Sequence, residues 1–134
     1  MTSRAERLTR LVSLMKLQLR LSEWQLVQLR QREQHLQDEE VYLVGALNDA
    51  ELPAGSSSYS ISRRLATTSV GARAVQAEAE KQLGQVHAQS RRVKHLEQVA
   101  RGVIASKQRE AEMRVLEEIA SAHSGVRDWT AMSS

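Results

Sequence analysis

A long heptad pattern dominates the first third of the chain. Between Leu8 and Leu47, one row of positions advances by alternating steps of four and three residues, and nine of its twelve members are apolar. This spacing is that of the a and d positions of a coiled coil, so it predicts a long helix that packs along another helix. The row, called the seam below, comprises Leu8, Val12, Met15, Leu19, Ser22, Leu26, Leu29, Glu33, Leu36, Glu40, Leu43 and Leu47.

A shorter stretch inside this segment has a different period. In MKLQLRLSEW, residues 15–24, Leu17, Leu19 and Leu21 alternate with polar residues, as in a half-buried strand. The alternation lasts only five residues, whereas the seam runs for nearly six heptads, and length therefore favours the helix. The local alternation arises because a second apolar row runs beside the seam. That row consists of Leu11, Leu14, Leu17, Leu21 and Trp24.

The composition also favours long helices with a thin, aliphatic core. The 134 residues include no Phe, two Trp, two Tyr and one Pro. Cys is absent, which excludes disulfides and thiolate chemistry and permits a reducing compartment. The first residues form no uncharged signal-peptide core, and no window approaches about eighteen apolar residues. We therefore expect an all-α protein in the cytoplasm, without an export signal or a membrane span.

Capping and breaker signals divide the chain. Ser3 and Glu6 have the spacing of a capping box, which predicts a helix start near Arg4. The segment NDAELPAGSSSYS is rich in turn residues, and Gly125 is a candidate helix stop. The predicted organisation is one hairpin domain with helix one at about 4–51, a turn at about 52–60, helix two at about 61–125 and a loose tail at 126–134.

The second helix continues the coiled-coil pattern but has weaker signals at its start. No capping box is evident after the serines, and Arg63 and Arg64 face the positive end of the helix dipole, so we expect its first turns to fray. A turn centred between residues 55 and 56 predicts antiparallel pairs whose numbers add to about 111. Helix two then outruns helix one, and residues 107–124 project alone. Its own seam is Val75, Ala79, Leu83, Val86, Ser90 and Val93.

Charge is segregated along the chain although the net charge is only +3. Residues 1–32 hold seven Arg or Lys against two Glu, and residues 81–109 hold seven against one. Residues 33–51 hold six acidic residues and no Arg or Lys. An antiparallel hairpin brings the two basic segments together, which predicts a positive end for an acidic partner. A solvated face that serves solubility remains the alternative.

No arrangement of residues points to catalysis. None of the four His has a Glu three residues before it, and no phosphate-binding glycine loop occurs. We expect no enzymatic activity, cofactor, metal or small-molecule substrate. Arg91, Arg92 and Lys94 have the charge to contact phosphates, but the stacking aromatics of single-strand binders are absent. Nucleic acid is therefore not an expected partner, although a basic coiled-coil scaffold or nucleic-acid binder stays open as an alternative.

The first helix resembles that of a known family. RAERLTRLVSLMKLQLRLSEWQLVQLRQREQHL is similar to the amino-terminal helix of the FliJ proteins of flagellar type III export, and more distantly to that of their injectisome counterparts. The resemblance implies a two-helix cytoplasmic stalk that couples an export ATPase hexamer to the cytoplasmic domain of the export gate. It also allows an escort role for export chaperones and peripheral contact with the cytoplasmic face of the inner membrane. The choice between the flagellar and injectisome systems stays open, and Tyr42 and Tyr59 are the only aromatic candidates for a gate contact near the turn.

The second apolar row is the main candidate for a partner surface. A two-helix coiled coil buries one seam, so this row should stay outside it, and an apolar strip of that kind often marks a contact site. The alternatives are that helix two wraps far enough to cover part of both rows, or that the second row pairs two copies of the protein. The candidate binding residues are Leu14, Leu17, Leu21, Trp24, Arg4, Arg7, Arg10, Arg91, Arg92 and Lys94.

Overall fold

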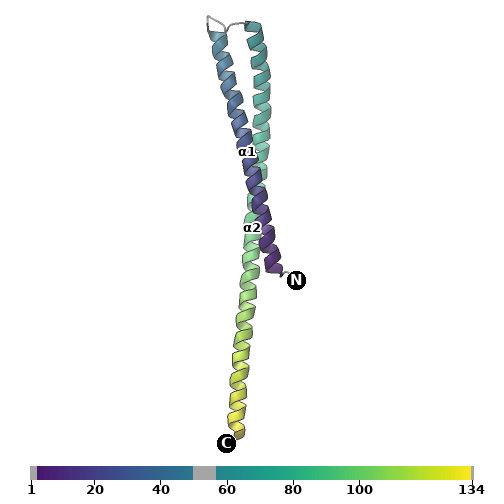
Figure 1. Cartoon of the computed structure of the whole chain (residues 1–134), viewed down its shortest axis with the longest axis vertical. Helices are drawn as coiled ribbons and strands as arrows, with labels where there is room; N and C mark the ends of the chain where they lie inside the picture. The colour runs from purple at the N-terminus through teal and green to yellow at the C-terminus, as the bar shows by residue number, and fades with distance from the viewer. Residues whose placement is uncertain (1–2, 50–56, 134) are drawn as a thin grey trace. The chain divides into compact units, whose positions relative to one another are not determined.

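The chain is all-α and forms a helical hairpin. The computed structural model describes residues 3–49 and 57–133, with side chains up to residue 125. Helix α1 spans Arg4–Asn48 and helix α2 spans Ser58–Ser133, and no strand occurs among the described residues. The two helices run antiparallel, and α2, with 76 residues, is longer than α1, with 45 (Figure 1). The predicted fold class is confirmed.

The start of α1 follows its capping signal. The Ser3 hydroxyl oxygen accepts a 3.2 Å hydrogen bond from the backbone N–H of Glu6, and the Ser3 carbonyl accepts one of 3.0 Å from Arg7. The first contact satisfies a backbone donor that has no partner within the helix, and the second is the first regular backbone bond of the helix. The helix therefore begins at Arg4, as the sequence predicts.

The start of α2 differs from the prediction. The Ser57 N–H donates to the Ser60 hydroxyl, and the Ser60 N–H donates to the Ser57 hydroxyl, both at 3.1 Å. This is a reciprocal capping box in which a serine takes the position that Glu or Gln usually occupies. The expectation that α2 lacks such a box is wrong, and the helix begins at Ser58 rather than near 61.

The other helix ends also depart from the sequence boundaries. Helix α1 ends at Asn48 rather than near 51, and residues 50–56 of the predicted turn lie outside the described residues. Helix α2 continues through Gly125 to Ser133, so the prediction of a loose tail from 126 is wrong. Gly125 does not adopt the left-handed backbone of a helix-stopping glycine. A lone glycine costs a helix only about 1 kcal/mol, and no proline follows it.

The chain divides into two compact units, and the larger comprises residues 14–92. Within it, the middle and end of α1 pack along the first half of α2, in the blue and teal parts of Figure 1. Arg64 pairs with Glu39, the Gly71 backbone lies beside Leu36, and Gln82 bonds to Ser22. The numbers of these pairs add to between 103 and 107, not to about 111. The shift follows from the helix ends, because Asn48 and Ser58 centre the connection on residue 53.

Burial in this unit follows the seam. Leu43 is 2% exposed and forms a cluster with Ala46 and Ile61, against which Leu47 and Leu65 pack. On α2, Val75, Ala79 and Val86 are buried as predicted. Three polar residues are also buried in this interface, namely Ser22, Glu33 and Thr68.

The smaller unit comprises residues 3–13 and 93–133 of the described chain. Here Val12 from α1 and Val93 and Ala100 from α2 are buried. Every described residue from Ile104 to Gly125 is exposed, so no described part of the chain covers this stretch of α2. The predicted projection of α2 is confirmed, and it begins three residues before Lys107. We call residues 104–125 the overhang.

Candidate protein-binding surfaces

Four large apolar side chains on α1 lie outside the hairpin interface. Leu14, Leu17, Leu21 and Trp24 are 57–60% exposed, and we call these four residues the outer strip. All twelve seam positions, by contrast, are buried or half-buried. The prediction that the second row stays outside the seam is confirmed, so the alternative that α2 wraps around both rows is wrong for these four residues.

The geometry of the helix explains this separation. Successive residues of an α-helix are rotated by about 100°. Val12, Met15, Leu19 and Ser22 face α2, which leaves the outer strip on the side of α1 turned away from it. A single partner helix covers only one face, so the outer strip stays exposed although its residues are as apolar as those of the seam.

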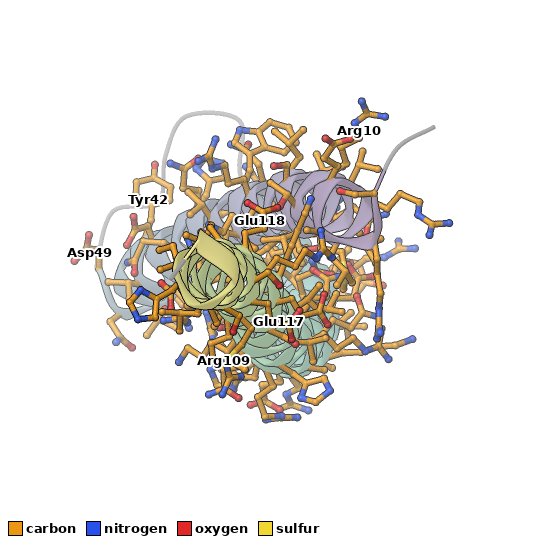
Figure 2. The ribbon with its side chains drawn as sticks, turned by 90° about the horizontal axis from the view of Figure 1, so that it is seen from below. Arg10, Tyr42, Asp49, Arg109, Glu117 and Glu118 are labelled. Carbon is orange, nitrogen blue, oxygen red and sulfur yellow. The ribbon has the colours of Figure 1, made fainter. Side chains whose placement is uncertain are left out.

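Other exposed apolar residues lie nearer the connection between the helices. Val41 is 73% exposed on α1 and Val70 is 66% exposed on α2, and neither emerged as a candidate from sequence reasoning. Both residues lie outside the two seams, and this position could have identified them as exposed. Tyr42 and Tyr59 are exposed as well, which leaves both rings accessible to a partner (Figure 2 labels Tyr42).

The basic candidates of the smaller unit are accessible. Arg4, Arg7 and Arg10 on α1 and Lys94 on α2 are exposed, and none of them forms an ion pair with another described residue. Figure 2 shows Arg10 extending away from the ribbon. This unit therefore brings the basic segments of the two helices together, as the antiparallel arrangement predicts. Their charges are available to an acidic partner.

Arg91 and Arg92 belong to the larger unit. Both are exposed and neither forms an ion pair with another described residue. The acidic stretch of α1 lies in the same unit but contacts a different arginine. Glu39 pairs with Arg64 at 2.9 Å, near the connection between the helices. Acidic and basic side chains thus meet there, while Arg91 and Arg92 remain unneutralised.

The described residues include neither a cluster of metal ligands nor a membrane-spanning helix. Within 3–49 and 57–125, no three His, Asp or Glu side chains gather as they would around a metal ion. Neither described helix contains a stretch apolar enough to cross a bilayer. What these parts of the chain offer to other molecules is apolar strips and exposed positive charge.

Comparisons with family models, with curated proteins and with solved structures find no match for this chain. Its function must therefore be inferred from its own sequence and surfaces.

Proposed function

We propose that this protein is a non-enzymatic stalk of type III protein export that resembles the FliJ proteins. It couples an export ATPase hexamer to the cytoplasmic domain of the export gate. The observation that carries this proposal is the outer strip, because the hairpin is complete without it. Large apolar side chains that stay exposed beside a finished interface usually mark a contact site for another protein.

The architecture and the charge both support this role. A long two-helix hairpin whose second helix outruns the first is the architecture that the family resemblance implies. Arg4, Arg7 and Arg10 present unpaired positive charge near the start of α1, which suits an acidic partner. Arg91, Arg92 and Lys94 add exposed positive charge on α2.

The proposal assigns each surface a task. The outer strip provides the apolar anchor for the ATPase or for another export component, and the basic residues steer and orient that encounter. Steering by charge raises association rates more than it raises affinity. Tyr42 and Tyr59 are the aromatic residues available to the gate, and export chaperones are further partners. A flagellar system is the first choice and an injectisome the alternative.

The decisive experiment removes two anchors of the outer strip. Leu17 and Leu21 are replaced by Gln, which keeps the helix and deletes apolar surface. Burying a large apolar side chain contributes about 1.5–3 kcal/mol, and each 1.4 kcal/mol is about a tenfold change in affinity. We expect at least a tenfold loss of affinity for the ATPase hexamer from the same cell, measured by surface plasmon resonance.

Two controls accompany this variant. Replacing Val41 and Val70 by Gln removes exposed apolar surface elsewhere in the same unit, and should leave ATPase binding within about twofold. Melting temperature and sedimentation are measured on the same samples. An unchanged melting temperature together with lost ATPase binding would support a partner surface. A large fall in melting temperature with no specific binding defect would show that the strip is core, and equal binding by all variants would remove it from the interface.

A further inference from the structure

The overhang of α2 carries an apolar stripe that no described residue covers. Its members recur at helical spacing along one face, and they include Val115, 54% exposed, and Ile119, 60% exposed. The stripe consists of Ile104, Ala111, Val115, Ile119 and Ala122. An apolar stripe along one face is typical of a helix that packs against another element.

This stripe continues an interface that already exists. Val93 and Ala100 are buried in the smaller unit, and Ile104 follows Ala100 by four residues on the same face of α2. Helix α1 covers α2 only as far as this point, because α1 begins at Arg4. The face that α2 uses against α1 thus extends past the end of α1. Most of the stability of a helix in a protein comes from packing of its apolar face, so the natural occupant is another helix.

The local shape suits a helical occupant. A shallow, mostly apolar concavity is lined by Ala111, Glu112, Val115 and Leu116. The small side chain of Ala111 leaves space between the larger neighbours on the next turn. Packed helices fill such hollows with side chains from the facing helix, as knobs fit into holes in a coiled coil.

The flanking charges identify the occupant as a second copy of this chain. Lys107 and Glu118 flank the stripe on one side, and Glu112 and His123 flank it on the other. In a parallel coiled coil, a residue on one flank meets the residue five positions later on the opposite flank of its partner. Lys107 then meets Glu112 of the second copy, and Glu118 meets His123.

None of these four groups forms an ion pair with another described residue, so each is available for such a contact. Figure 2 shows Glu118 and Arg109 on opposite sides of α2, which places Arg109 away from the pairing face.

We propose that the overhangs of two copies pair in parallel, with the stripe as their shared seam. The pairing extends the interface between α1 and α2 onto a second molecule and dimerises the protein through its last third. It does not depend on the export role. It uses the overhang of α2, whereas the proposed export role uses the outer strip of α1. Mutations can therefore disrupt one surface without the other.

Engineered cysteines test the direction of pairing, because the natural chain contains none. Ala111→Cys places the thiol in the shared seam, where two parallel copies bring the same residue together. We expect mild oxidation to produce a disulfide-linked dimer at least tenfold faster than for Met113→Cys, which is exposed on the opposite face. Equal rates would overturn the proposal. Rapid cross-linking that needs Ala111→Cys on one copy and Val115→Cys on the other would show antiparallel pairing and overturn it as well.

A charge swap tests the same interface without oxidation. Lys107→Glu places a negative charge against Glu112 of the second copy, and should raise the dimer dissociation constant at least fivefold by sedimentation equilibrium. Combining it with Glu112→Lys should restore the original value, which a merely structural role would not produce. The Leu17 and Leu21 double Gln variant should dimerise normally. A chain that stays monomeric at hundreds of micromolar, or one whose dimer is lost with the outer strip, would overturn the proposal.

Discussion

The side-chain amide of Gln82 on α2 donates a 3.0 Å hydrogen bond to the backbone carbonyl of Ser22 on α1, and a second of 3.2 Å to the side-chain oxygen of Gln25. Ser22 is one of the few polar members of the seam and is buried. An apolar seam packs almost equally well in neighbouring registers, whereas a directional bond between two particular residues is made in only one. Gln82 therefore fixes the alignment of the two helices in the larger unit.

Replacing Gln82 by Ala should lower the free energy of unfolding by about 1 kcal/mol, since an intramolecular hydrogen bond contributes about 0.5–1.5 kcal/mol net and one of the two partners is exposed. The measurement is urea denaturation followed by circular dichroism. Gln85→Ala is the matched control, because Gln85 lies on the same helix and is exposed. Equal effects of the two substitutions would contradict a role for Gln82 in fixing the register.

Leu43→Ala should be the most damaging truncation of a leucine on α1. Leu43 is 2% exposed and packs in the cluster with Ala46 and Ile61. Deleting a buried leucine side chain to alanine costs about 2–5 kcal/mol. Leu17→Ala is the control, because its side chain is 58% exposed and its loss should cost less than about 0.5 kcal/mol. Thermal unfolding compares both variants, and similar melting temperatures would argue against this core.

Ser57→Ala should destabilise the first turn of α2. The Ser57 hydroxyl accepts the Ser60 N–H, and loss of an N-cap side chain costs about 0.5–2 kcal/mol. Amide hydrogen exchange should therefore accelerate at Ser60 and its neighbours. Ser57→Asp should restore protection because Asp is an equally good N-cap, and Ser62→Ala within the helix should change little. Unaltered exchange in Ser57→Ala would show that the cap does not hold this helix end.

Reversing Arg4, Arg7 and Arg10 to Glu should weaken binding to an export ATPase hexamer, because these side chains are exposed and unpaired. The effect should shrink as salt is added, since exposed charges are screened over about 8 Å at physiological ionic strength. Reversal of Arg63, Arg64 and Arg73 is the control, and it should affect binding less. Equal losses from the two sets would contradict contact through the start of α1.

The periodic features of this protein were predictable because they depend on local geometry alone. The steps of three and four residues identify both seams, and every seam position of α1, from Leu8 to Leu47, is at least half-buried. The capping signal at Ser3 likewise predicts the start of α1. The outer strip is likewise recognisable from residue spacing alone.

Other features required contacts that no periodicity encodes. The serine pair that caps α2 has a spacing that many serine-rich turns share, and only the reciprocal bonds between Ser57 and Ser60 distinguish it.

The residue pattern alone predicts that two long helices form and which face of each is apolar, because the rotation per residue is the same in every α-helix. The alignment of the two helices, by contrast, depends on contacts between them, such as the bond between Gln82 and Ser22. The length of α2 that stays uncovered depends on that alignment and on the start of α1 at Arg4. An apolar row has the same sequence pattern whether it is buried or exposed, because the position of the neighbouring helix determines its burial.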